Sequence, residues 1–250
     1  MSSTSIVLAS SIFRVHKEGL FYKFGDEPEK GIPLIQAELT RAKVLEPGAV
    51  LRSYVDSAYQ RGGAETYICR MSITTDRAAL RLFVKTIIEP GRGADMVQRR
   101  RLLEAHKVPT TRLVGFLPGK EEGSVCDLFE EDVNPEAEMT LDASNPQVLP
   151  YLSPSALEEL GKTAAVLDHL GFAAVNFVRD MLVSSDKSRI YYADFGSDLG
   201  GPGAFSRKDS FFTLERYFRN RPEVHSIVTK AYHKRMTELQ PAAEEVERSS

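Results

Sequence analysis

Two aspartates flank a short segment whose residue types favour a β-hairpin. The apolar runs 181–183 and 190–192 are rich in β-forming residues, and the polar run 184–188 separates them as a turn would. Asp180 precedes the first run, and Asp194 follows the second. Because both ends of a hairpin lie side by side, the two carboxylates can share a divalent cation.

Phe195 and Gly196 follow Asp194, and the order strand, turn, strand, Asp-Phe-Gly resembles the metal-binding hairpin of the protein-kinase-like superfamily. That superfamily includes the aminoglycoside phosphotransferases and minimal bacterial effector kinases. The resemblance covers about residues 49–219. It implies a two-lobed α+β fold with a reduced C-terminal lobe, in which ATP and Mg²⁺ bind in the cleft between the lobes. It also implies that Asp194 and Asp180 hold the Mg²⁺, although the family has Asn where this chain has Asp180.

Lys85 is the candidate nucleotide-binding lysine. It follows Val84 near the end of the last of three predicted strands, which span residues 49–55, 66–71 and 80–88. In kinase-like proteins a lysine at this place reaches the α- and β-phosphates of ATP, so the resemblance implies the same role for Lys85. From the residue alone, an edge-strand lysine that faces water is equally compatible.

Two further segments are expected to contact the nucleotide. Gly62 and Gly63 let backbone N–H groups approach a phosphate, although a plain two-glycine hairpin turn is the more common use of such a pair. A strand over residues 124–129 ends at Phe129 and is followed by the acidic run 130–132. The resemblance implies that this run is the hinge, where backbone groups meet the adenine.

A helix is predicted over residues 94–106, and the resemblance implies that an acid on it pairs with Lys85. Glu104 is the only Glu on this helix, and its distance along the chain from Lys85 suits the family. The spacing to the following strand suits Gln98 better, so both candidates stay open. The helix also carries three arginines, which are expected to face solvent: Arg99, Arg100 and Arg101.

The expected catalytic loop departs from the family. A count back from Asp180 places Val175, or with a one-residue gap Asn176, where the family has the aspartate that orients the attacking hydroxyl. Neither side chain can accept a proton usefully. Asp168 and His169 stand nearby, at the end of a helix that Ser153-Pro154 opens, and are interpreted as a cap or a surface pair.

Three functions therefore stay open. The preferred one is an ATP-dependent phosphotransferase that acts on an unknown protein or small-molecule acceptor. The second is a pseudokinase that binds a nucleotide or a partner without turnover, because the catalytic base is missing. The third is an α+β binding module of another fold, in which Asp-Phe-Gly is coincidental. The first is preferred because Lys85 and both metal-site acids have no evident purpose in a scaffold.

Composition excludes several other classes. The chain has 250 residues and a formal net charge of −3, which gives no general attraction to nucleic acid. Cys69 and Cys126 are the only cysteines, so a disulfide scaffold is excluded and a reducing, cytoplasmic setting is favoured. No apolar stretch is long enough to span a bilayer, and the Ser-rich start, 1–11, fits a tail and an export signal equally well.

The predicted organisation has three parts. Residues 1–48 form an N-terminal extension, with a hairpin over 12–24 and a helix that begins at Pro33. Residues 49–132 form a β-rich lobe with one helix. Residues 133–250 form a small helical lobe that contains the metal-binding hairpin and ends in two helices, over 211–219 and 222–239.

Overall fold

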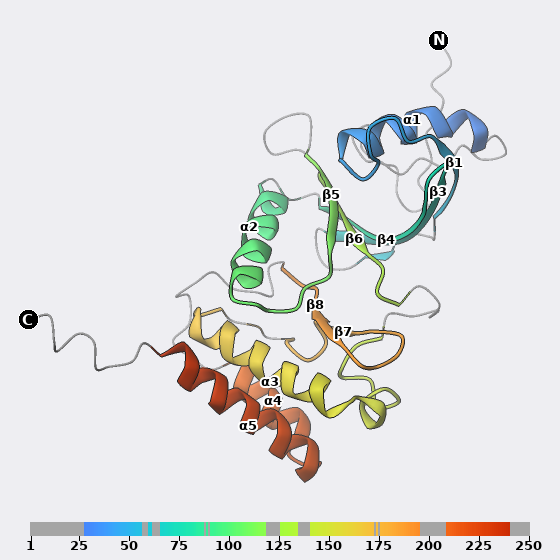
Figure 1. Ribbon diagram of the computed structural model, residues 1–250. Helices are drawn as coiled ribbons and strands as arrows, with labels where there is room; N and C mark the ends of the chain where they lie inside the picture. The colour runs from blue at the N-terminus through green and yellow to red at the C-terminus, as the bar shows by residue number, and fades with distance from the viewer. Residues whose placement is uncertain are drawn as a thin grey trace, which may run out of the picture. The chain divides into compact units, whose positions relative to one another are not determined.

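The chain forms two compact units, of which one is sheet-rich and the other mostly helical (Figure 1). Unit 1 comprises Met1–Asp95 and Thr111–Asp132, and unit 2 comprises Met96–Thr110 and Val133–Ser250. The computed structural model describes residues 28–56, 60–61, 66–87, 89, 91–118, 126–134, 141–172, 174, 176–195 and 209–240. The α+β class and the two-lobed architecture agree with the predicted fold class. The hairpin predicted over 12–24 lies outside the described residues.

Unit 1 is built on a six-stranded antiparallel sheet with the order β1-β3-β4-β6-β5, in which β2 also pairs with β3. Its strands are β1 (Leu51–Asp56), β2 (Gln60–Arg61), β3 (Thr66–Thr75), β4 (Ala79–Ile87), β5 (Leu113–Leu117) and β6 (Cys126–Glu131). The three strands predicted over residues 49–55, 66–71 and 80–88 correspond to β1, β3 and β4, and their ends differ from the prediction by a few residues. Lys85 lies on β4, between β3 and β6 in the sheet and not at its edge.

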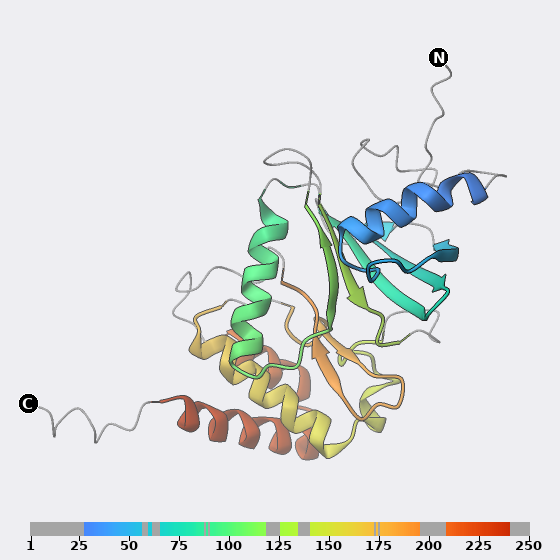
Figure 2. The same ribbon diagram turned by 45° about the horizontal axis from the view of Figure 1, so that its top comes forward.

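One face of this sheet carries the core of unit 1. Leu82 and Val84 of β4 alternate onto it, and their partners Met71, Cys69 and Phe129 join the same buried cluster. Helix α1 (Pro28–Arg41) covers this face in Figure 2 and adds its own apolar residues to the cluster: Ile35 and Leu39. Burying each such side chain contributes about 1.5–3 kcal/mol to the free energy of folding. Because the apolar residues are gathered on this face, polar side chains of the sheet lie on the opposite face.

Helix α1 begins earlier than the sequence predicts. Its first residue is Pro28, and Pro33 lies inside the helix. Proline is tolerated at the first helical position because its missing N–H has no partner there, and Pro28 meets that condition. Pro33 is exposed, so its ring does not disturb the packed side of the helix.

Helix α2 (Arg92–Ala105) starts in unit 1 and continues in unit 2. It includes Gly93, which lies just before the helix predicted over residues 94–106. A Cβ at Gly93 would lie 2.0 Å from Sγ of Cys126, so only glycine lets the first turn of α2 lie this close to β6. Burial, with the charge of Asp127 adding to it, raises the pKa of the Cys126 thiol to about 12. Cys126 therefore serves packing and not thiolate chemistry.

Besides most of α2, the described residues of unit 2 form the helices α3 (Pro154–His169), α4 (Asp209–Phe218) and α5 (Pro222–Leu239) and the short 3-10 helix η1 (Leu149–Tyr151). Helices α3 and α5 lie side by side in both views (Figures 1 and 2). Ser153 caps α3 by accepting the N–H of Ala156 at 3.2 Å, as Ser153-Pro154 predicts. No helix among the described residues has the length and apolar character needed to cross a membrane.

Candidate functional site

The predicted hairpin is confirmed. Strands β7 (Met181–Val183) and β8 (Ile190–Tyr192) pair antiparallel, with Met181 opposite Tyr192. Asp186 holds the turn, because its carboxylate accepts hydrogen bonds from the hydroxyls of Ser184 at 2.5 Å and Ser188 at 2.7 Å. These bonds lower the pKa of the Asp186 carboxyl to about 2. The turn therefore fixes the register that aligns the two ends of the hairpin.

The register brings Asp180 and Asp194 to the same end of the hairpin. The backbone N–H of Ala193 donates to the carbonyl of Asp180 at 3.0 Å, so Asp194 is the next residue after a direct partner of Asp180. Both aspartates are partly exposed. The structure thus places the two aspartates that the sequence singles out at one end of the hairpin, and their role as metal ligands stays a prediction.

Helix α2 fixes the residue that follows Asp194. The guanidinium of Arg100 lies 4.4 Å from the centroid of the Phe195 ring, and the Arg99 side chain donates to the Phe195 carbonyl at 3.4 Å. Arg100 is 2% exposed, so the expectation that all three arginines face solvent is wrong for Arg100. A guanidinium stacks favourably on an aromatic face, which gives this buried cation a partner on the Asp-Phe-Gly segment. Tyr192 meets the same ring edge-on at 5.4 Å.

The loop before the hairpin is a tight turn at the expected catalytic position. The carbonyl of Asn176 accepts the N–H of Arg179 at 2.7 Å and that of Asp180 at 3.2 Å. Val175 lies outside the described residues, so of the two candidate positions only Asn176 is seen. A cavity of about 460 Å³ adjoins this turn and is lined by Asn176, Arg179, Thr213, Arg216 and Tyr217. Two arginines in one cavity make it suited to an anionic group.

Asp168 has a structural role, as the interpretation of a cap proposes. Its carboxylate accepts the backbone N–H groups of Ser210 and Phe211 at 3.0 and 3.1 Å, at the start of α4, and the hydroxyl of Tyr232 at 3.0 Å. Burial raises the pKa of the Asp168 carboxyl, and these hydrogen bonds oppose that rise. The helix that Asp168 caps is α4 and not its own helix α3. His169 is exposed.

Unit 1 contributes a buried lysine with a carboxylate beside it. Lys85 is 8% exposed, and its Nζ lies 3.4 Å from Oε2 of Glu130, which is 1% exposed and also accepts the Thr111 hydroxyl at 3.0 Å. Phe83 pairs with Glu130 and Lys85 pairs with Leu128, so Lys85 and Glu130 are diagonal neighbours on the sheet face opposite the core. The reading of Lys85 as an edge lysine that faces water is therefore wrong. Sequence reasoning missed Glu130 as a partner.

The remaining predicted contacts are placed as follows. Glu104 is exposed and accepts the hydroxyl of Thr110 at 2.8 Å, and Gln98 is exposed as well. Both belong to unit 2, so the pairing of either with Lys85 stays a prediction. Gly62 and Gly63 lie outside the described residues, between the paired strands β2 and β3.

The side chain of Phe129 points into the core of unit 1. It is 0% exposed and belongs to the apolar cluster on the core face of the sheet. Lys85 occupies the other face, because it pairs with Leu128 and Phe129 pairs with Val84. The contact of Phe129 with a nucleotide stays a prediction, and its side chain serves the core of unit 1.

Asp180 and Asp194 are residues of a kind that can hold Mg²⁺ at a bound nucleotide. No group of three or more His, Cys, Asp or Glu side chains able to hold a metal occurs in the part of the chain that the structure describes. Mg²⁺ at a nucleotide is usually held by only one or two carboxylates together with the phosphates. Asp180 and Asp194 supply such a pair of carboxylates at one end of the hairpin.

No protein-family model matches the sequence, and no curated protein matches it. Solved structures do resemble the chain. The Cydia pomonella granulovirus kinase PK-1 matches with 14% identity and a TM-score of 0.41 over 68% of this chain and 56% of its own. WaaP, solved in complex with acyl carrier protein, matches with 15% identity and a TM-score of 0.43 over 72% of this chain and 80% of its own. The chain thus spans just over half of the viral kinase, and likeness at this level says nothing of activity.

Proposed function

We propose that this chain is an ATP-dependent phosphotransferase of the kinase-like superfamily. The observation that supports the proposal is the pairing of Ala193 with Asp180, because it makes residues 180 and 194 neighbours at one end of the β7–β8 hairpin. The buried Lys85 on the polar face of the unit 1 sheet supports it. In the proposal, these three side chains contact the same nucleotide.

Each residue has a distinct role. Asp180 and Asp194 would hold Mg²⁺, which neutralises charge on the phosphates when it is bound. The Lys85 ammonium neutralises phosphate charge directly, and Glu130 orients this ammonium within the sheet. Arg99 and Arg100 contact the carbonyl and the ring of Phe195, and these contacts hold the backbone next to Asp194 in place. Transfer then depends on positioning and on charge stabilisation, which suffices for an acceptor whose nucleophile is already reactive.

The acceptor in this proposal enters the cavity beside Asn176. Arg179 and Arg216 line it and would attract an acceptor that carries an anionic group, whether a small molecule or an acidic segment of a protein. The Asn176 amide can donate or accept a hydrogen bond to position a hydroxyl, but it cannot remove the proton. The proton of the hydroxyl must therefore leave to solvent or to a phosphate oxygen.

A second candidate function is a pseudokinase. The observation that favours it is the turn Asn176-Phe177-Val178-Arg179, which carries no group able to act as a general base. In that case Lys85 and the hairpin bind ATP, or a partner protein, without turnover.

Transfer from labelled ATP tests the proposal. The wild-type chain with Mg²⁺ should label an acceptor in cell extract or an anionic small molecule, and Asp194→Asn should lower the rate by at least about 100-fold. Glu158→Gln is the control, because it removes one negative charge from the exposed side of α3, away from the hairpin. It should keep the transfer rate in the folded protein. Transfer that persists undiminished in Asp194→Asn refutes the mechanism, and ATP binding without any transfer identifies the pseudokinase.

A further inference from the structure

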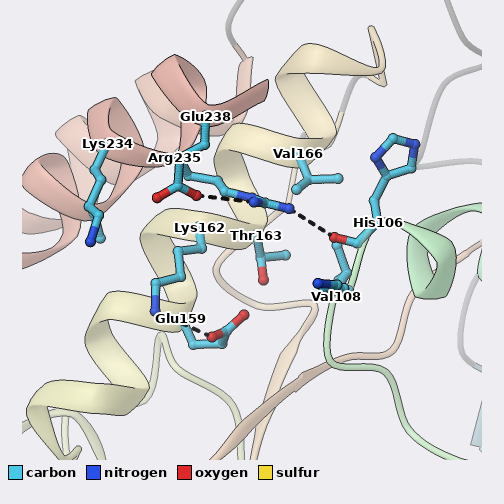
Figure 3. Close-up of a pocket in the computed structure, with 11 residues that line it drawn as sticks. His106, Val108, Glu159, Lys162, Thr163, Val166, Lys234, Arg235 and Glu238 are labelled. Atoms are coloured by element: carbon cyan, nitrogen blue, oxygen red, sulfur yellow. Dashed lines mark hydrogen bonds and ion pairs between the residues drawn. The ribbon is translucent and has the colours of Figure 1, made fainter. Parts of the chain in front are cut away.

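A second cavity in unit 2 lies among α3, α5 and the residues that follow α2 (Figure 3). Its volume is about 330 Å³, within the size range of small-molecule sites. None of its lining residues takes part in the proposed transfer. Six charged side chains line it, four cations and two carboxylates: Lys107, Lys162, Lys234, Arg235, Glu159 and Glu238. The lining is therefore positive overall, although the net charge of the chain is −3.

Arg235 is held in place at this cavity. Its guanidinium donates to the carboxylate of Glu238 at 3.1 Å and to the carbonyl of His106 at 3.3 Å, so it joins α5 to the end of α2. Figure 3 shows both contacts as dashed lines. The positive end of the cavity is therefore ordered without a ligand, and a ligand would not have to immobilise this side chain.

The three lysines of the cavity make weaker ion pairs than Arg235, or none among the described residues. Lys162 has only long contacts, at 3.6 Å to Glu158 and 3.9 Å to Glu159. Within the described residues, no ion pair involves Lys107 or Lys234. Three ammonium groups at one cavity are thus available to an anion.

Thr163 adds a buried hydroxyl to the lining. The residue is 1% exposed, and its Oγ1 has no hydrogen-bond partner among the described residues. Figure 3 places it between Lys162, Val166 and Val108. A buried hydroxyl without a partner destabilises a protein, so a ligand oxygen that reaches Oγ1 after a small shift of the lining would satisfy it.

Lys107 also occupies a position where glycine is usual. Its φ is +62°, because α2 ends in a Schellman motif in which Val108 N–H donates to the Leu103 carbonyl at 3.0 Å and Lys107 N–H to Glu104 at 2.9 Å. Helix α1 ends in the same way at Lys43, whose φ is also +62° but which does not line the cavity. The chain therefore offers a matched pair, in which a glycine at either position suits the backbone.

We infer that this cavity binds a phosphate dianion, either free or as the monoester of a small molecule. A dianion balances the excess of two positive charges on the lining. Its oxygens can accept from several ammonium groups and from the Thr163 hydroxyl at once, which a single carboxylate does less well. The site is separate from the proposed nucleotide contacts, so it does not depend on the proposed function.

Calorimetric titration tests the inference, with inorganic phosphate and phenyl phosphate as probes at constant ionic strength. Both should bind the wild-type chain, and Lys107→Gly should weaken the affinity by about 5-fold while Lys43→Gly leaves it unchanged. Thr163→Val should weaken it as well without loss of stability, because the variant removes a hydroxyl that has no partner. Tighter binding of phenyl phosphate than of inorganic phosphate would identify a monoester as the ligand, and the reverse would identify free phosphate.

Lys85→Ala separates the cavity from the nucleotide contacts and should bind both probes as the wild type does. The inference is overturned if neither probe binds at millimolar concentration, or if Lys107→Gly and Lys43→Gly bind equally. It is also overturned if Lys85→Ala, and not Lys107→Gly, loses the phosphate.

Discussion

Lys85 and Glu130 form a buried charged pair, which the proposed function uses as part of a nucleotide site. A buried ammonium is costly without a carboxylate, and Glu130 lies 3.4 Å from it on the neighbouring strand β6. Thr111 occupies a further lone pair of the same carboxylate. The pair therefore holds the ammonium in one direction before any phosphate arrives, which reduces the entropy lost on binding.

Asp186 gives a residue-scale prediction about pH. Its pKa is lowered to about 2 in the folded chain, so its contribution to stability is fully present above its ordinary pKa, near 4. The contribution should disappear as the pH falls from about 4 to about 2. Carboxyl NMR titration should report the low pKa. The free energy of unfolding should fall less over this range in Asp186→Asn than in wild type, and equal falls would contradict the assignment.

The sequence indicates residues of the candidate site where the signal is local. Asp180 and Asp194 are found because six apolar residues and a polar turn between them define a hairpin by themselves. Glu130 is missed because its proximity to Lys85 follows from the register of β4 on β6, which joins segments far apart in the chain. Arg100 is missed because a helix with three consecutive arginines does not reveal which of them turns inward.

At the scale of elements, the close crossing of α3 and α5 supports the helical part of unit 2. Gly161 permits it, because a Cβ there would lie 2.2 Å from the Val228 carbonyl and 3.0 Å from Cβ of Ala231. Asp168, the last residue but one of the same helix, accepts hydrogen bonds from the start of α4. These contacts hold the frame on which the turn at Asn176 and the hairpin are built.

Gly161→Ala tests this crossing. Helix propensity alone predicts that alanine stabilises the helix by about 1 kcal/mol. The backbone of α5 leaves no room for a methyl group, so overpacking should prevail and lower the free energy of unfolding by about 1–3 kcal/mol. Urea denaturation measures the change. Glu158→Ala, on the exposed side of α3, should stay within about 0.5 kcal/mol, and a gain in stability for Gly161→Ala would contradict the close crossing.

Elements are predicted well where their ends carry chemical signals. Ser153-Pro154 and Pro222 mark the starts of α3 and α5, and the structure places both helices there. The start of α1 is wrong because two prolines, Pro28 and Pro33, compete for the first helical position. The predicted start of α2, residue 94, is two residues late, because the fit of Gly93 against Cys126 depends on the packed sheet and not on local sequence.

At the scale of the whole molecule, the proposed function draws on both units. Unit 1 supplies Lys85 with Glu130, and unit 2 supplies Asp180 and Asp194. One nucleotide that contacts all of them would favour the folded, liganded form of both units by mass action. The phosphate cavity involves unit 2 alone, so its loss should leave nucleotide binding intact.

The dissociation constant for ATP with Mg²⁺ tests the central claim most directly, because it needs no knowledge of the acceptor. The wild-type chain should bind ATP saturably. Lys85→Met, in unit 1, and Asp194→Asn, in unit 2, should each weaken binding by at least about 10-fold, whereas Lys107→Gly should not. Wild-type affinity in both Lys85→Met and Asp194→Asn, or no saturable binding by the wild-type chain at millimolar ATP, would contradict the account.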